Sequence, residues 1–183
     1  MNKLGGFITL IRPVNCLMMG FAVLVGAILA NPQLGSLNWL NLLFGYLTGF
    51  TFCVAAMVIN DYYDRKIDAI NEPQRPIPSG TVKPNEALAF VGVLSVIGFV
   101  FAGYVSVLCF VVAAAALAIT ATYITVGKRS GLPGNFLVSI CVAIPFIYGS
   151  ITSIGTVGLN VLLFASMAFY QILAGKSQRA LWM

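Results

Sequence analysis

Long apolar stretches alternate with short polar ones along this chain. The first apolar stretch runs from about Val14 to Ala30, and the second runs from Trp39 to about Ile59. A helix needs about 20 apolar residues to cross the hydrocarbon layer of a membrane. The pattern therefore predicts an all-α, polytopic membrane protein with these two stretches as its first two spans.

The same criterion predicts four further spans. Residues 87–127 carry no charge, which leaves room for two spans with a hinge at Gly103-Tyr104-Val105-Ser106. A fifth span ends near Ile151. A sixth begins near Val161 and reaches only about Ala174 before charged residues return. About six transmembrane helices are expected, and the last is short for a crossing.

The positions of the basic residues predict how the spans are oriented. They lie before the first span, between the second and third, between the fourth and fifth, and after the sixth: Lys3, Arg12, Arg65, Lys66, Arg75, Lys83, Lys128, Arg129, Lys176 and Arg179. Lys and Arg gather on the cytoplasmic side of membrane proteins. We therefore expect both termini and the polar segment 60–84 to be cytoplasmic, in a protein of the cell membrane.

The composition limits which partners and which kinds of catalytic or metal-binding residue this chain can have. Of 183 residues, 60% are hydrophobic and only 8% are charged, against about 25% charged in soluble domains. The net charge of +5 favours anionic headgroups or anionic substrates as partners, and nothing indicates nucleic-acid binding. The chain has no histidine, which excludes histidine ligands and histidine acid–base catalysis. The four cysteines lack metal-type or disulfide-type spacing and are expected to be buried apolar groups: Cys16, Cys53, Cys109 and Cys141.

The polar segment holds four of the five acidic residues, Asp61, Asp64, Asp68 and Glu72. If the second span continues as a helix through Asp68, then Asp64 and Asp68 lie within about 60° of Asp61, and Asn60 lies about 100° away. Like charges at such spacings repel one another on a helix. The cluster therefore needs a compensating cation.

Two cations could compensate these carboxylates. Mg²⁺ binds one or two carboxylates and completes its shell with water and substrate phosphate oxygens, which predicts a Mg²⁺–diphosphate site with the ligands Asn60, Asp61, Asp64 and Asp68. The alternative is a solvated helix end whose acids are offset by Arg65 and Lys66.

The segment NDYYDRKIDAINEPQRPIPSG, residues 60–80, resembles the first aspartate-rich motif of the UbiA superfamily of intramembrane prenyltransferases. The family form is roughly N-D-x-x-D-x-x-x-D, followed by a short loop with Arg-Pro and Pro-Ser-Gly. Asn15 in IRPVNCL and the block containing Tyr123, Lys128-Arg129 and Asn135 are also similar to family landmarks. The short spacing from Asp68 to Pro73-Gln74-Arg75-Pro76 is most similar to archaeal members, which attach a geranylgeranyl group to geranylgeranylglyceryl phosphate during ether-lipid synthesis.

The resemblance implies a bundle of about nine transmembrane helices around a central cavity that opens to the cytoplasm and laterally to lipid. Residues 1–183 would form one incomplete domain with about six of these helices. Two aspartate-rich motifs would hold Mg²⁺ on the diphosphate of a polyprenyl donor, and the acceptor would be lipid-like. No acidic residue follows Glu86, so only the first motif is present. Residues 170–183 are interpreted as an aberrant tail, and the chain is expected to be a truncated form with little activity of its own.

The resemblance also assigns roles to single residues. Asp61, Asp64 and Asp68 would be the catalytic carboxylates that act through the metal. The expected substrate-binding residues are Asn15, Asn60, Arg75, Tyr123, Lys128, Arg129 and Asn135. Arginine suits this role because its planar fork matches phosphate oxygens.

Several alternatives stay open at this stage. Lys128 and Arg129 could simply anchor the end of a span, Arg75 could belong to a rigid surface turn, and Asn15 could bond a neighbouring helix. The acceptor could instead be an aromatic quinone precursor. The chain could also be a non-catalytic membrane remnant or subunit, or a small transporter.

Overall fold

The computed structural model describes the backbone of residues 2–181 and the side chains through residue 175. Within that part of the chain, the structure is all-helical. Its seven α-helices are α1 (Lys3–Ile11), α2 (Pro13–Ala30), α3 (Trp39–Asn71), α4 (Pro84–Val105), α5 (Val107–Thr125), α6 (Leu132–Ile154) and α7 (Leu159–Leu181). Two short 3₁₀ helices, η1 (Leu34–Ser36) and η2 (Gly127–Arg129), lie in the connections.

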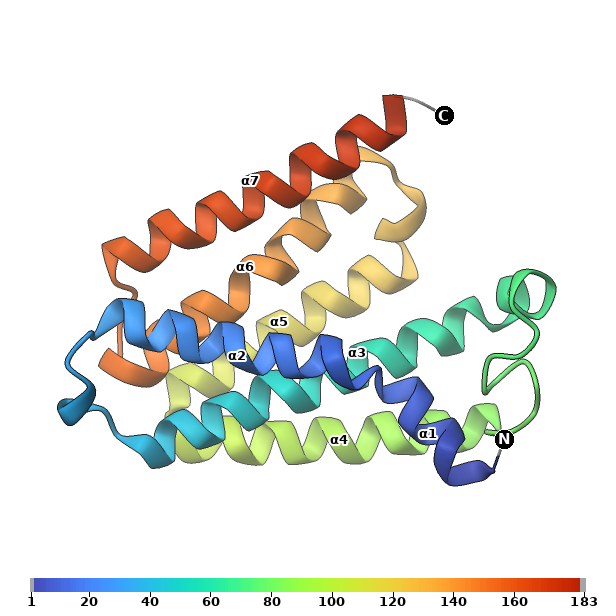
Figure 1. Ribbon diagram of the computed structural model, residues 1–183, viewed down its shortest axis with the longest axis horizontal. Coiled ribbons are helices and arrows are strands. Elements are labelled where there is room, and N and C mark those ends of the chain that lie inside the picture. The colour runs from blue at the N-terminus through green and yellow to red at the C-terminus, as the bar shows by residue number, and fades with distance from the viewer. Residues whose placement is uncertain (1, 182–183) are drawn as a thin grey trace.

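The long helices form an elongated bundle (Figure 1). Helix α2 packs against both α3 and α6, while α4 covers α3 and α7 covers α6. Helices α2 to α6 are each long and apolar enough to cross a membrane, whereas α7 offers a shorter apolar part, Leu159–Gly175. The bundle therefore confirms the prediction of a polytopic helical membrane protein, with five full-length candidate spans and a shorter sixth.

Local sequence explains where the helices begin. Asn38 caps α3 by accepting from the amides of Leu40 and Asn41, both at 3.1 Å. Proline opens α4, as expected from Pro84, because its missing N–H is not needed in a first turn. Ser106 alone separates α4 from α5, and its hydroxyl accepts from the amide of Cys109. The hinge predicted at residues 103–106 is thus confirmed.

Two helix boundaries differ from the sequence prediction. Helix α3 continues past Ile59, where the second span was expected to end, to Asn71, so the acidic residues of the motif lie on a helix, the condition under which a shared face was predicted. The N-terminal residues also form a separate helix, α1, which the apolar pattern did not indicate. Arg12 separates α1 from α2 with a left-handed backbone at φ 49°, and Pro13 then starts α2.

Helix α7 begins two residues earlier than expected and continues without a break through Leu181. The backbone shows no change of structure at residue 170. The predicted tail, residues 170–183, lies partly outside the described residues, so its aberrant character stays a prediction.

Glycines bring α2 and α6 into backbone contact. A Cβ added at Gly149 would lie 1.9 Å from the carbonyl oxygen of Val23, and one at Gly26 would lie 2.0 Å from the carbonyl oxygen of Phe146. Small residues at helix contacts are the usual way in which membrane helices pack closely. The cysteines are free, and three of the four are buried as predicted.

Candidate functional site

The last turns of α3 turn their acidic side chains toward the bundle. Asp61 is 5% exposed and Asp68 is 8% exposed, while Asp64 is half-buried. Buried carboxylates are unfavourable unless they are paired and hydrogen-bonded. The partners of these three groups therefore define the site.

Asp61 and Asp68 belong to one network of charges. Arg12 Nη2 donates to Asp61 Oδ1 at 2.6 Å. Arg75 Nη1 donates to Asp68 Oδ2 at 2.9 Å and lies 3.7 Å from Asp61 Oδ1. Arg75 Nε also donates to Glu72 Oε2 at 2.7 Å. This last hydrogen bond, supported by the charges of Asp68 and Asp61, raises the pKa of Arg75 above its ordinary value, so the guanidinium keeps its charge.

The loop that carries Arg75 is folded rather than extended. The amide of Ser79 donates to the carbonyl of Arg75 at 2.9 Å, and the amide of Val82 donates to Pro76 at 2.9 Å. Ile77 and Val82 are buried in the same core cluster as Leu10 of α1. The loop is thus held against the bundle, which fixes the direction from which Arg75 reaches the carboxylates.

Asp64 belongs to a second group of partners. Lys128, in η2, donates to Asn60 Oδ1 at 2.8 Å and forms an ion pair with Asp64 Oδ2. Asn60 Nδ2 also donates to Asp64 Oδ2 at 3.1 Å. The structure therefore brings Lys128 to the acidic face of α3 across a long separation in sequence, and a role limited to anchoring a span end does not account for this contact.

The other predicted site residues lie in different surroundings. Tyr123 is half-buried near the same end of the bundle and lines a cavity. Arg129 is exposed, Asn135 is partly buried in the first turns of α6, and Asn15 is exposed in the first turn of α2. For all of the predicted substrate-binding residues, including Asn15, Arg129 and Asn135, a part in substrate binding stays a prediction.

Arg65 and Lys66 do not offset the acidic residues in this structure. Arg65 stacks over the ring of Tyr62 at 4.1 Å and donates to the carbonyl of Tyr62 at 2.6 Å, and Lys66 is exposed. The charges that meet the carboxylates come instead from Arg12, Arg75 and Lys128.

Arg12 is the site residue that sequence reasoning missed. The sequence pattern marks it only as a basic residue at the predicted cytoplasmic end of the first span. One signal could have identified it, because an ionisable residue beside an apolar span usually has a partner within the bundle. The identity of that partner, 49 positions away, requires the three-dimensional structure.

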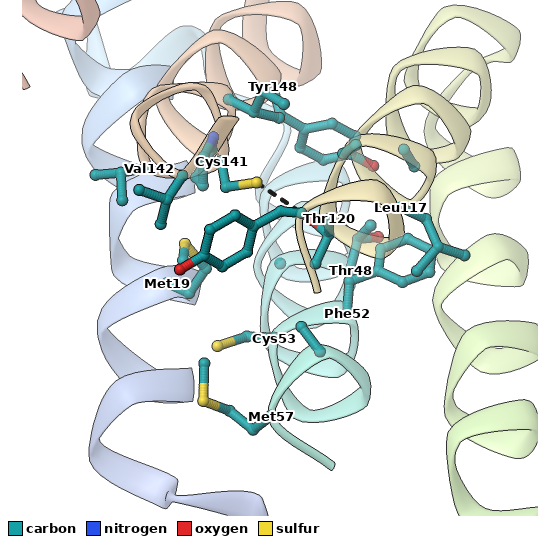
Figure 2. A pocket seen from close by; sticks show the side chains of 18 of the residues that line it. Met19, Thr48, Phe52, Cys53, Met57, Leu117, Thr120, Cys141, Val142 and Tyr148 are labelled. Atoms are coloured by element: carbon teal, nitrogen blue, oxygen red, sulfur yellow. Dashed lines mark hydrogen bonds between the residues drawn. The ribbon is translucent and has the colours of Figure 1, made fainter. Parts of the chain in front are cut away.

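A cavity of about 320 Å³ begins at this polar cluster and extends between α2, α3, α5 and α6 (Figure 2). Arg12 and Asn60 line it near the acidic residues, and Thr48 lines it farther along α3. Twelve residues separate Asn60 from Thr48, which corresponds to about 18 Å along a helix. Most of the remaining lining is apolar, as shown by Met19, Phe52, Met57, Leu117, Val142 and Pro145.

The donor set at the mouth of the cavity fits Mg²⁺ in its chemistry. In the part of the chain that the structure describes, no three His, Cys, Asp or Glu side chains lie close enough to hold a metal ion. However, Mg²⁺ needs only one or two carboxylates when water and phosphate oxygens complete its shell. The adjacent oxygens of Asn60 and Asp64 supply such donors, and Asp61 and Asp68 lie on the same helix end.

Comparisons with known proteins agree on one family. The profile of the UbiA prenyltransferase family matches residues 19–175. A digeranylgeranylglyceryl phosphate synthase of Korarchaeum cryptofilum is 36% identical over 169 residues, which cover 92% of this chain and 58% of that protein. A synthase of the same name from Methanococcus vannielii is 33% identical and is covered to 59%. The chain thus spans a little under three fifths of the length of these curated relatives.

Solved structures show the same fold. A structure of digeranylgeranylglyceryl phosphate synthase in membranes matches with a TM-score of 0.82 and 28% identity. The match covers 98% of this chain and 62% of the chain in that structure. A UbiA homologue from Archaeoglobus fulgidus, bound to GPP and Mg²⁺, matches with a TM-score of 0.74 at 19% identity. The second likeness supports the fold alone.

Proposed function

This chain belongs to the UbiA prenyltransferase family, and from that premise we propose that it forms the diphosphate-binding part of an intramembrane enzyme. The proposed reaction transfers a geranylgeranyl group from its diphosphate to geranylgeranylglyceryl phosphate. The observation that carries the proposal is a cluster of cations and carboxylates at the mouth of an apolar cavity. A molecule with an anionic head and a hydrocarbon tail has the two chemical properties that this arrangement offers.

The charges at the mouth explain why a divalent cation is needed. Arg12, Arg75 and Lys128 face the carboxylates Asp61, Asp64 and Asp68, so these six side chains carry no net charge, and Glu72, which also pairs with Arg75, makes the cluster negative. A diphosphate alone would gain little from such a cluster and would be repelled by its carboxylates. Asn60, Asp61, Asp64 and Asp68 would hold Mg²⁺, which when bound stabilises the negative charge that develops on the leaving diphosphate.

The basic residues then change partners. Arg75 and Lys128, which pair with Asp68 and Asp64 in this structure, would donate to phosphate oxygens when the carboxylates hold the metal. Arg75 comes from a folded loop, so little backbone freedom is lost when its guanidinium binds. Charge-assisted hydrogen bonds of this kind fix the orientation of the head group, and Tyr123 at the same end of the cavity would contact the first carbons of the tail.

The cavity would receive the isoprenoid tail. Its lining excludes water from the allylic carbon, which protects a reactive cationic centre from hydrolysis. Because the basic residues lie in alternate connections, the mouth would face the cytoplasm, where soluble Mg²⁺ and diphosphates are available. The acceptor would approach the same mouth with its own phosphate.

Binding of the donor tests the proposal directly. The chain, reconstituted in lipid nanodiscs, should bind geranylgeranyl diphosphate in the presence of Mg²⁺ and at least about tenfold more weakly when EDTA removes the metal. Lys66→Ala, a change at an exposed residue outside the cluster, should leave binding unchanged. Equal binding with and without Mg²⁺, or no binding in either case, would contradict the proposed function.

The acceptor requires a longer protein. A version extended to the length of the curated relatives should form product with geranylgeranylglyceryl phosphate and not with an aromatic acid such as 4-hydroxybenzoate. Product with the aromatic acid alone would assign the chain to quinone synthesis instead.

A further inference from the structure

The cavity is lined by four helices, and on each of them the lining residues end at about the same depth from the mouth. Counted from the mouth, the deepest lining residues are Val23 on α2, Thr48 on α3, Ala113 on α5 and Tyr148 on α6. Each helix continues past this level, to Ala30, Trp39, Val107 and Ile154 respectively. The cavity is therefore closed inside the bundle rather than at the end of the helices.

The closing residues are sealed from the outside. Val23, Thr48, Ala113 and Tyr148 are each at most 4% exposed, and all of them except Thr48 belong to one core cluster. Gly149, next to Tyr148, packs against the backbone of Val23, so the ring of Tyr148 is anchored where α2 and α6 touch. We call Val23, Thr48, Ala113 and Tyr148 the floor of the cavity.

Tyr148 is the largest residue of the floor, and its hydroxyl does not contribute to stability in an evident way. Its hydroxyl is buried and makes no hydrogen bond of good geometry within the described residues, although the side chains of Thr48 and Cys109 lie close enough to interact with it. The hydroxyl of Thr48, at the same level, donates to the carbonyl of Phe44 at 2.8 Å. A buried hydroxyl without a well-aligned partner is unfavourable for folding and calls for another explanation. Figure 2 shows Tyr148 at one end of the cavity and Met57 toward the other.

The depth of the cavity defines a length. Asn60 at the mouth and Thr48 at the floor are about 18 Å apart along α3. Three successive covalent bonds in an extended chain span about 3.8 Å, so an isoprene unit of four bonds spans about 5 Å. The cavity therefore holds about three to four isoprene units, or about 15–20 carbons, between the polar cluster and Tyr148.

We propose that Tyr148 is the residue that limits the length of the isoprenoid tail, by closing the cavity after about four isoprene units. This inference rests on the proposed function, because it assumes that the tail of a polyprenyl diphosphate occupies the cavity. Burial alone selects little among tails, since surrounding lipid is as apolar as the cavity. A tail that is too long must either overpack the closed end or bend out of the cavity, so selection comes from the shape of the floor.

A competition assay with tails of different length tests the floor. In nanodiscs with Mg²⁺, the wild-type chain should bind a C20 diphosphate about tenfold or more tightly than a C30 diphosphate, the scale expected when extra methylenes meet a filled cavity. In Tyr148→Ala, the C30 diphosphate should bind within about threefold of the C20 diphosphate. Tyr148→Phe keeps the ring and should keep the wild-type preference, which separates the shape of the floor from its hydroxyl.

A second substitution moves the limit in the opposite direction. Ala116, on α5, lines the cavity about one turn nearer the mouth than Ala113. Ala116→Phe should raise the floor by roughly one isoprene unit, so that a C15 diphosphate outcompetes a C20 diphosphate. Equal binding of C20 and C30 by the wild type, or an unchanged preference in both Tyr148→Ala and Ala116→Phe, would overturn the inference.

A third measurement distinguishes an error in the inference about the floor from an error in the proposed function. Geranylgeraniol with a photoreactive diazirine at the end of its tail needs no metal or phosphate contact. It should label Thr48, Ala113 or Tyr148, as located by mass spectrometry. Loss of all diphosphate binding together with labelling of these residues would refute the proposed head-group site and support the floor. Labelling confined to the exposed apolar face of α4 would overturn the floor.

Discussion

The two ends of the cavity are built in opposite ways. At the mouth, long charged side chains from four parts of the chain meet in pairs, and such pairs can exchange partners when a ligand arrives. At the floor, apolar side chains of one core cluster pack beside the point where the backbones of α2 and α6 touch, and close packing of this kind resists rearrangement. The comparison predicts that the proposed recognition of the head group and the proposed limitation of the tail can be changed independently.

The largest effect should come from removing a carboxylate at the mouth. In a version of the protein extended to the length of its relatives, Asp64→Ala should lower Mg²⁺-dependent prenyl transfer about 100-fold or more, because it removes a metal donor and the partner of Lys128. Product formation from geranylgeranyl diphosphate measures this. Glu86→Gln, at an acidic residue distant from the cavity, serves as the control. Unchanged turnover of Asp64→Ala would rule out its place in the site.

A substitution beside the floor should lower the stability of the fold instead. Gly149→Ala places a Cβ against the carbonyl oxygen of Val23 and should lower the free energy of unfolding by about 3 kcal/mol, as overpacking does. Thermal unfolding in detergent measures the loss. Gly92 in α4 is the matched control, because an added Cβ there meets nothing within 4 Å, and Gly92→Ala should be neutral or slightly stabilising. Equal effects of the two substitutions would refute the packing argument.

The mouth also contributes to stability, although less. Arg12→Ala leaves the more distant Arg75 as the cationic partner of the buried Asp61, and should lower the free energy of unfolding by about 2 kcal/mol, the scale of a poorly satisfied buried charge. The same unfolding assay applies. Adding Asp61→Asn should restore most of the loss, since it removes the charge that was left without its partner. A double variant no better than Arg12→Ala would show that the two side chains do not act together.

The smallest effect on stability is expected at a solvent-exposed ion pair. Lys3 and Glu86 form a 2.7 Å ion pair, but the side chain of Lys3 is 61% exposed. Lys3→Ala should therefore change the free energy of unfolding by less than about 1 kcal/mol, and 1 M salt should abolish even that difference. A larger, salt-insensitive loss would mean that α1 depends on this contact more than its exposure indicates.

The sequence predicted the mouth better than the floor, for a physical reason. Charged residues are rare in this chain, so the spacing of Asp61, Asp64 and Asp68 is easy to recognise in the sequence. Apolar residues are common, and nothing in the sequence distinguishes Tyr148 or Thr48, which close the cavity, from residues that face lipid. Only the packing of four helices makes that distinction.

One boundary error and the missed site residue involve the same contacts. The apolar pattern predicts that the second span ends near Ile59 because polar residues follow, whereas α3 continues to Asn71 and its carboxylates pair with Arg12, Arg75 and Lys128 from other elements. The contact of Arg12 with Asp61 joins residues 49 positions apart, so the sequence pattern does not reveal it. Interactions between residues far apart along the chain therefore determine which residues belong to the site.

The seam between α2 and α6 restricts how a bulky lipid can be admitted. Where Gly26 and Gly149 touch the opposite backbone, any parting of the two helices would break their closest contacts, so α2 and α6 should behave as a single rigid wall. We expect α5 to move more readily, because its cavity side carries the small residues Ala113 and Ala116 and because a single serine joins it to α4. A covalent tether from α5 to α3 should slow loading of the donor, whereas one from α2 to α6 should not.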